Sequence, residues 1–472
     1  MKTYFVKLLS IIITMVFIAV LCVGCSTTSG TNIVLTDSYH GDRWYFGFGS
    51  KEIIPEYDSG EPLYIAGYNN GWEITGVLDY CEARAVWLDT GSDGVLLIGI
   101  DCIGLDSGIV AQIRAALSDL PNCSAINVYS THTHAGIDTL GLWGPIGVDG
   151  KNDAYMEALI SAAVDAARKA AADRRAGSLY YGSIPTAKMY RDSRDPQVYD
   201  ETLHHLRFAP DDGSNGIRLY FYGAHAESLR GDNTLLSRDF PGILCDEVKS
   251  ITGDDAMFFP GAVGGLIMTK PFVEDTGLQA LENLHITANK LVACARCISP
   301  ICEQQISPDM AFSRVEFTIP MDNTAFVLYK YLGILTNQAV TADSATGYGV
   351  RTELSVLMLD QIALTLVPGE IFPELVYGGS YGDANAEGVN PPSFTEIAEA
   401  SGIQQILIVG LSNDEIGYIV PPSDFLLNEK LPYIEKTMDY KGENHYEETN
   451  SIGPECATVI AEAFQTALEA LN

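Results

Sequence analysis

Apolar and polar residues alternate along this chain in a way that predicts strands and helices following one another. Short runs rich in β-branched and aromatic residues, bounded by glycine, proline or polar residues, are typical of strands. In the first part of the chain such runs cover residues 83–89, 95–101, 125–129, 179–182, 203–208, 217–222 and 256–259. Apolar residues spaced three and four apart predict helices at residues 107–117, 153–175, 240–251 and 275–297.

A second series of elements begins near residue 300, where two Ser-Pro pairs interrupt the pattern. Strands are expected at residues 312–319, 355–359, 362–367 and 405–410, and a closing helix at 457–471. This alternation is typical of an α/β fold, so we expect mixed, largely buried sheets covered by helices. We assign residues 41–472 to this folded region, with a possible subdivision near residue 300.

The first 25 residues have the composition of an export signal. Lys2 and Lys7 precede an apolar run at 8–20, and Gly24-Cys25 follows, with small polar residues after it. This junction resembles a bacterial lipoprotein cleavage site, which implies a lipid thioether on Cys25. An uncleaved anchor helix and a plainly secreted protein are the alternatives. We therefore expect a signal peptide over 1–25, a flexible tether over 26–40, and an extracytoplasmic protein anchored to the cell membrane.

The balance of charge narrows the possible partners. The chain has 28 Lys and Arg residues against 61 Asp and Glu residues, which gives a formal net charge of −33. Such an acidic surface repels nucleic acid and anionic lipid headgroups at long range. We therefore expect no nucleic-acid partner, whereas neutral and zwitterionic substrates stay possible.

Three cysteines, Cys294, Cys297 and Cys302, have the spacing C-x2-C-x4-C, which is compatible with a zinc site. However, Cys294 and Cys297 lie at helical spacing on a largely apolar run, and no fourth ligand has the spacing of a zinc knuckle. We favour buried thiols or one disulfide over a metal site.

Ligand-type side chains follow four of the expected strands. These junctions carry His132 with His134, His225 with Glu227, Glu370, and Tyr418. Functional groups of α/β folds gather where strands end. Side chains two residues apart in an extended segment point the same way, so His132 and His134 would face one site. There they would bind a metal or divide metal binding and proton transfer between them. Taken singly, each junction is equally compatible with an ordinary turn.

Taken together, the motifs resemble those of the neutral ceramidases, which are zinc amidases that cleave the N-acyl bond of ceramide. The most specific of them is Thr131-His132-Thr133-His134-Ala135-Gly136. The others, in chain order, are Tyr45-Phe46-Gly47-Phe48-Gly49, Ala66-Gly67-Tyr68, Gly223-Ala224-His225, Ser237-Arg238-Asp239, Val367-Pro368-Gly369-Glu370, Gly417-Tyr418 and Tyr446-Glu447. The resemblance extends over residues 44–472.

This resemblance implies a zinc enzyme and a set of metal ligands. The ligand positions fall on His132, His225, Glu370 and Tyr418. A mixture of imidazole, carboxylate and phenolate suits Zn²⁺ and leaves room for a water molecule.

The resemblance also implies catalytic residues around the metal. His134 takes the place of a histidine that transfers a proton or binds substrate. Arg191 approximately matches an arginine that contacts the substrate and the developing oxyanion, with Arg194 as a nearby alternative. Tyr446 matches a tyrosine of the site.

The chain departs from the family pattern at two points. Gly261 stands where the family has its serine nucleophile, and Gly265 stands where it has an aspartate. We therefore expect a water molecule activated by Zn²⁺ to be the nucleophile. The family also carries a C-terminal β-sandwich domain beyond the catalytic part, and we expect lipidation of Cys25 to replace its contribution to membrane attachment.

These observations predict a zinc-dependent amide hydrolase that cleaves an N-acyl bond of a lipid-like substrate. One alternative is a metal-dependent deacylase or esterase that acts on another small substrate. The other is a non-catalytic, ligand-binding lipoprotein on the same scaffold. Loss of the serine and the aspartate favours this last alternative, whereas retention of four ligand positions opposes it.

Overall fold

The computed structural model describes residues 31–55, 60–192, 194–265, 267–270, 278–381, 386–442 and 444–471. The predicted signal peptide, Cys25 and the first residues of the predicted tether lie outside this range. Asn32–His40, the second half of the predicted tether, is strand β1 and pairs antiparallel with β15 (Asp309–Met321). It forms a strand because Leu35 and Tyr39 pack against the core between the two main sheets. The prediction of a flexible tether is therefore wrong for this half.

The larger sheet contains nine described strands in the order β12-β10-β9-β7-β2-β4-β5-β6, with β14 beside β7. Its strands are β2 (Trp44–Glu52), β4 (Glu82–Asp89), β5 (Gly94–Ile100), β6 (Cys123–Ser130), β7 (Arg175–Pro185), β9 (Thr202–Pro210), β10 (Ile217–Tyr222), β12 (Asp255–Pro260) and β14 (Gln304–Ile306). Only the pairs β5–β6 and β10–β12 in this sheet are parallel. The predicted hairpin is the antiparallel pair β4–β5.

The smaller sheet has the order β1-β15-β17-β18-β20, with β16 beside β17. Its remaining strands are β16 (Gln338–Thr341), β17 (Tyr348–Leu359), β18 (Ile362–Leu366) and β20 (Gln405–Val409). The chain passes from one sheet to the other between β14 and β15, close to the predicted subdivision. Because β1 returns the N-terminal segment to the smaller sheet, the boundary is not a simple cut in the sequence.

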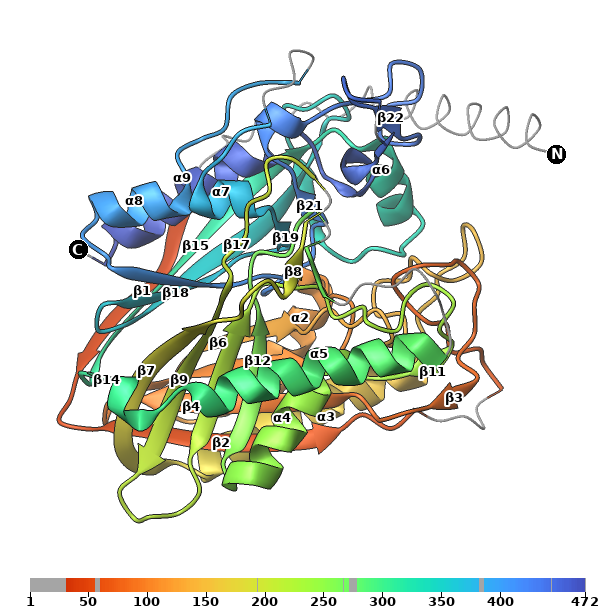
Figure 1. Cartoon of the computed structure of the whole chain (residues 1–472). Helices are drawn as coiled ribbons and strands as arrows, with labels where there is room; N and C mark the ends of the chain where they lie inside the picture. The colour runs from red at the N-terminus through yellow and green to blue at the C-terminus, as the bar shows by residue number, and fades with distance from the viewer. Residues whose placement is uncertain are drawn as a thin grey trace.

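The two sheets pack face to face, and helices cover their outer faces. On β4, Val86 and Leu88 point into the core between the sheets, whereas Ala85 and Trp87 point to the helices on the other face. The helices that pack on the larger sheet are α2 (Ser107–Ala116), α3 (Asp153–Ala172), α4 (Asp239–Thr252) and α5 (Leu278–Cys297). Those on the smaller sheet are α7 (Pro373–Tyr377), α8 (Phe394–Ala400) and α9 (Cys456–Glu469). Figure 1 shows these two groups on opposite sides of the molecule, and the predicted α/β class is confirmed.

Short elements connect the layers. The paired two-residue strands are β3 (Gly76–Val77) with β11 (Leu235–Leu236), β8 (Tyr190–Arg191) with β13 (Met268–Thr269), β19 (Glu370–Ile371) with β21 (Tyr418–Ile419), and β22 (Thr437–Met438) with β23 (Asn444–His445). Helix α6 (Thr324–Tyr331) follows β15, and single 3-10 turns occupy Pro300–Cys302, Pro422–Asp424 and Glu447–Asn450.

The helices and the cysteines of the described residues provide two further observations. None of the described helices is both long and apolar enough to cross a membrane. The eight cysteines in the described part of the chain are free, and two of the clustered ones, Cys297 and Cys302, are exposed. The cluster therefore contains no disulfide, and the expectation that its thiols are buried is wrong for these two residues.

Candidate metal centre

The loops that follow β6 and β10 lie side by side and bring three histidines together. Thr133 forms a parallel bridge with Ala226, and the backbone amide of His134 donates to the carbonyl of Ala226 at 2.9 Å. His132 and His134 belong to the first loop, and His225 precedes Ala226 in the second. The backbone contact between the loops thus fixes the separation of the imidazoles.

The remaining candidate ligands lie on a separate two-stranded pair, whose strands follow β18 and β20 of the smaller sheet in the chain. Glu370 on β19 and Tyr418 on β21 are register partners in a parallel pair, so their side chains leave the ladder side by side. Backbone hydrogen bonds from Gly410 to Pro260 and from Asn413 to Val128 join the end of the smaller sheet to the larger one. The site therefore lies where the strand ends of both sheets meet.

The His132 backbone explains why its ring approaches that of His134. Residue 132 has φ +63°, a conformation that costs energy in a residue other than glycine and that is concentrated at functional sites. The two rings are edge to face with centroids 4.7 Å apart. Their convergence therefore arises from a turn, and the prediction of an extended segment at His132 is wrong.

Four candidate ligand atoms converge on one small volume. His132 Nε2 lies 3.2 Å from His134 Nε2 and 3.3 Å from Glu370 Oε2, while His225 Nε2 lies 3.1 Å from the same carboxylate oxygen. His132 and His225 are buried, with exposed fractions of 3% and 1%. Two ligands of a tetrahedral Zn²⁺, each about 2.0 to 2.1 Å from the metal, would lie about 3.3 to 3.4 Å apart. The spacing of these atoms suits such an ion.

The tautomers of two histidines are set by the backbone. His132 Nδ1 lies 2.7 Å from the carbonyl of Ile103, and His225 Nδ1 lies 3.2 Å from the carbonyl of Ile267. A proton on each Nδ1 leaves a lone pair on each Nε2, and both lone pairs then face Glu370 Oε2. A group of electron-pair donors facing one another in a buried place is stabilised by a cation between them. These residues therefore fit a zinc ion.

The carboxylate and the imidazoles of the site also shift one another's pKa values. Burial opposes ionisation of Glu370, but attraction to His132 and His225 lowers the pKa of its carboxyl. Burial disfavours protonation of His132, yet Glu370 raises the pKa of its imidazole. Burial and the two neighbouring histidines lower the pKa of His134 well below its ordinary value. His134 is thus held neutral beside a carboxylate, in the state that can accept a proton or bind a metal.

The position of His134 is compatible with metal binding as well as with its predicted role. Its Nε2 is one of a group of three histidine ligand atoms that lie within 4.8 Å of one another. The family resemblance implies that this residue transfers a proton or binds substrate, while the geometry places it as near to the centre as the predicted ligands.

Tyr418 and Tyr446 form the next layer of the site. Their hydroxyl groups hydrogen-bond, and their rings meet edge to face with centroids 6.4 Å apart. Burial, followed by the nearby Glu370 carboxylate, raises the pKa of the Tyr418 hydroxyl well above its ordinary value. A neighbouring cation would therefore be needed to hold Tyr418 as a phenolate ligand.

The two arginines proposed from sequence occupy different environments. Arg191 is half-buried on β8 and is the register partner of Met268 on β13. Arg194 is also half-buried, and it donates to Asp424 at 2.8 Å and to Glu374 at 3.1 Å. Its guanidinium also lies 4.2 Å from the centroid of the Phe372 ring. Arg194 thus joins the segment after β8 to the loops that carry the predicted ligands.

The two glycines that depart from the family pattern are closely packed. A Cβ added to Gly261 would lie 2.9 Å from Cα of Gly223 and 3.1 Å from its nitrogen, both of which are backbone atoms at the end of β10. A Cβ on Gly265 would lie 2.2 Å from the guanidinium carbon of Arg194, at a residue with φ +73°. The volumes that a serine and an aspartate would need are therefore filled by Gly223 and Arg194.

The structure adds two residues to the site that the sequence did not assign. The Tyr68 hydroxyl donates a short hydrogen bond to Glu227, and the Tyr68 ring meets the His134 ring with centroids 5.3 Å apart. Glu227 is buried, with 3% of its surface exposed. Glu227 lies two residues after His225, and Tyr68 belongs to an N-terminal motif, so both positions were visible in the sequence. Their contact, across 159 residues, was not.

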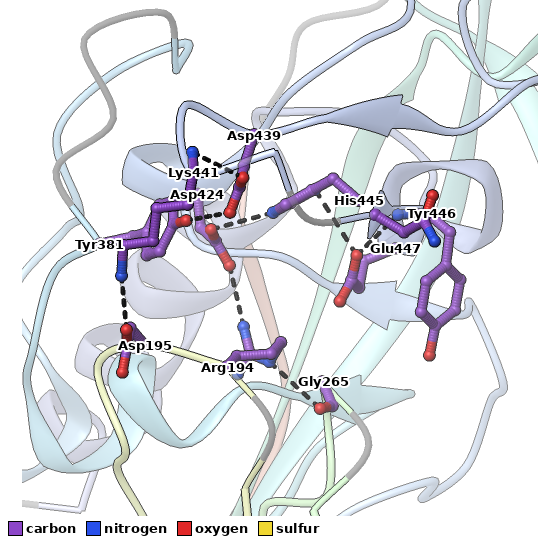
Figure 2. A pocket seen from close by; sticks show the side chains of 11 residues that line it. Arg194, Asp195, Gly265, Tyr381, Asp424, Asp439, Lys441, His445, Tyr446 and Glu447 are labelled. Carbon is purple, nitrogen blue, oxygen red and sulfur yellow. Dashed lines mark hydrogen bonds and ion pairs between the residues drawn. The ribbon is translucent and has the colours of Figure 1, made fainter.

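A polar pocket opens beside the centre. It has a volume of about 240 Å³ and is lined by Arg194, Asp195, Gly265, Tyr381, Asp424, Asp439, Lys441, Asn444, His445, Tyr446 and Glu447. Figure 2 shows Arg194 between Asp424 and Gly265, with His445 on the other side of Asp424. Through Tyr446, which hydrogen-bonds to Tyr418, this pocket adjoins the predicted ligands.

Comparison with known proteins gives the identity of the fold. No protein-family model matches the sequence, and no curated protein is significantly similar to it. Among solved structures, a neutral ceramidase from Pseudomonas aeruginosa superposes with a TM-score of 0.68 at 16% sequence identity, covering 91% of this chain and 74% of that one. A structure described as ceramidase complexed with C2 superposes with a TM-score of 0.66, also at 16% identity, over 91% and 75% of the two chains. The chain therefore has the fold of the neutral ceramidases.

Proposed function

We propose that this protein is a zinc-dependent amide hydrolase that cleaves the N-acyl bond of a lipid-like substrate. The observation that carries the proposal is the convergence of three imidazole nitrogens and one carboxylate oxygen at separations of 3.1 to 3.3 Å. The ceramidase-like fold supports the choice of reaction, because the site occupies the strand ends where α/β folds place their chemistry.

The residues of this chain fit the parts that such a reaction needs. His132, His225, Glu370 and Tyr418 would hold Zn²⁺, with His134 close enough to serve as a further ligand. Bound there, the ion would polarise the scissile carbonyl and lower the pKa of a water molecule, which is the nucleophile we expect in place of the serine.

The protein groups around the ligands supply proton transfer and charge stabilisation. His134 Nε2 lies 3.2 Å from the candidate ligand atom of His132, where it would take a proton from the attacking water and return it to the leaving amine. Arg191 is the predicted donor to the developing oxyanion, and Tyr446 faces the polar pocket next to Tyr418.

We further propose that lipidation of Cys25 attaches the protein to the outer side of the cell membrane, near a lipid substrate. Changing Cys25 to Ser should move the protein from the membrane fraction to the soluble fraction while leaving the turnover of a detergent-dispersed substrate unchanged. Unaltered membrane fractionation of C25S would refute this attachment.

The hydrolase proposal is tested with a panel of N-acyl substrates, assayed with and without a zinc chelator. Fatty acid release that stops with chelator and returns with added Zn²⁺ is the expected result. The absence of chelator-sensitive release across the whole panel would defeat the proposal.

A matched pair of variants separates catalysis from ligand binding on the same scaffold. His225→Ala removes a predicted ligand, whereas His40→Ala alters a histidine on exposed strand β1, far along the chain from the cluster. We expect H225A to lose zinc and activity together and H40A to retain both. A zinc-free protein that still binds N-acyl lipid would instead support the non-catalytic alternative.

A further inference from the structure

The polar pocket beside the metal centre has a lining unlike that of a site for a hydrocarbon chain. Four of its residues are carboxylates and three are basic, and its aromatic residues are tyrosines. Its volume of about 240 Å³ can hold one small molecule or one ring-sized group. A polar ligand is therefore expected.

The three basic residues of the lining are each already paired with one of its carboxylates. Lys441 Nζ lies 2.5 Å from Asp195, and Arg194 pairs with Asp424 at 2.8 Å. His445 contacts Asp424 at 3.1 Å on its other side. Burial lowers the pKa of His445, but hydrogen bonds to carboxylates raise it to about 11, so it carries a positive charge at neutral pH.

Three carboxylates of the lining each face a cation, and Asp439 accepts from the Tyr381 hydroxyl, so a ligand without net charge is favoured. An anion or a cation entering the pocket would have to compete with an existing ion pair, which costs desolvation energy. A neutral ligand with several hydroxyl groups can donate to Asp195 or Asp439 and accept from Lys441 or Asn444 without breaking a pair. Such a ligand satisfies both kinds of partner at once.

Tyrosine rings at the pocket indicate the shape of ligand that would fit there. Tyr381 lines the pocket, and its hydroxyl donates to Asp439. The ring of Tyr440, which is 59% exposed, lies beside it with centroids 5.5 Å apart. Tyrosine rings offer a flat apolar face with a polar tip, which suits a ring-shaped molecule that has apolar faces and polar edges.

From these features we propose that the pocket binds a neutral sugar ring. The pocket adjoins the predicted metal ligands through Tyr446 and Tyr418, so the sugar would be the polar head of the N-acyl substrate. This assignment rests on the proposed hydrolase function. The substrate class would then be a glycosylated lipid amide. A free monosaccharide has the same chemistry and is the other source of such a ligand.

The first experiment measures binding alone, so it does not depend on catalysis. The zinc-loaded full chain is titrated with methyl β-glucopyranoside, and saturation is followed by calorimetry or by ligand-detected NMR. We expect saturable binding that weakens at least tenfold in Asn444→Ala and in Asp439→Asn, and weaker binding of glucuronate and glucosamine. The control is Tyr331→Ala, which alters a tyrosine that is 78% exposed on α6, outside the pocket lining.

The second experiment identifies the source of the sugar. Release of fatty acid is compared between an N-acyl lipid carrying one neutral hexose and the same lipid without it. A preference of tenfold or more for the glycosylated lipid, lost in N444A and kept in Y331A, assigns the pocket to the substrate head. Saturable glycoside binding without this preference assigns it to a free sugar.

The binding experiment and the hydrolase experiment can fail independently of each other. A chain that cleaves no amide but binds the glycoside through Asn444 keeps the sugar site and loses the proposed reaction. Absence of saturable binding by the wild-type chain, or binding that N444A and D439N leave unchanged, overturns the sugar site whatever the activity.

Discussion

Restoring a serine at residue 261 should destabilise the protein and should not increase its activity. In the chain as it stands, Cβ of a serine there would approach Cα of Gly223 to 2.9 Å and its nitrogen to 3.1 Å. Both are backbone atoms at the junction of two buried, parallel-paired strands, β10 and β12, so neither can move away as a flexible side chain would. Overpacking of a buried site of this kind costs about 1 to 3 kcal/mol.

The assay is equilibrium urea unfolding of Gly261→Ser and Gly261→Ala beside the wild-type chain. Gly388→Ser is the matched control, because a Cβ on Gly388 meets its nearest neighbour, Pro422, at an ordinary 3.7 Å. We expect G388S to stay within about 0.5 kcal/mol of wild type and both 261 variants to lose about 1 to 3 kcal/mol. Equal stability of G261S and G388S, or a rise in amide hydrolysis by G261S, would refute the view that this position is closed to a side-chain nucleophile.

Three further predictions follow from individual contacts. Arg194→Ala should lower the free energy of unfolding by about 3 to 5 kcal/mol, because it leaves the buried Glu374 without its cation and Asp424 with His445 alone; denaturant titration measures this, and a loss below about 1 kcal/mol would contradict it. Burial alone would raise the pKa of Glu303, but contacts with a histidine and an arginine of β9 lower it from 4.5 to about 2. The ionised Glu303 therefore stabilises the folded protein fully above pH 4.5, and this contribution is lost as the pH falls toward 2. Glu303→Gln should therefore flatten the fall in stability over this range, and an unchanged pH profile would contradict the assignment. Tyr418→Phe should weaken zinc retention during dialysis against a chelator more than Tyr446→Phe, which removes only a partner of the ligand; equal zinc loss in both variants would remove Tyr418 from the ligand set.

The local pattern of the chain was enough to predict most of the strands that build the site. The run at 217–222 coincides with β10, and the predicted hairpin is β4–β5, because each strand is a compact apolar run with turn residues at its ends. The strand-end position of the three histidines followed from these assignments. Pattern alone did not indicate β1, whose mostly polar residues become a strand only by pairing with β15, far along the chain.

Contacts between distant segments account for what the sequence left undetermined. Tyr68 and Glu227 are 159 positions apart and meet only in the folded chain, so the local sequence around neither residue predicts their contact. The family resemblance implies Arg191 as the oxyanion donor, with Arg194 as a nearby alternative. Contacts with Phe372 and two carboxylates distinguish Arg194, and these partners come from loops that only the tertiary structure places there.

The central claim is that His132, His225 and Glu370 form a zinc site together with their neighbours, and the zinc content of the purified chain tests it most directly. After dialysis against buffer treated to remove free metal, elemental analysis of the wild-type chain should find one zinc per chain, and His225→Ala should retain less than about one-tenth of it, in line with the loss of a ligand. A wild-type chain that holds no zinc after incubation with the metal, or an H225A variant that holds as much as wild type, would contradict the account.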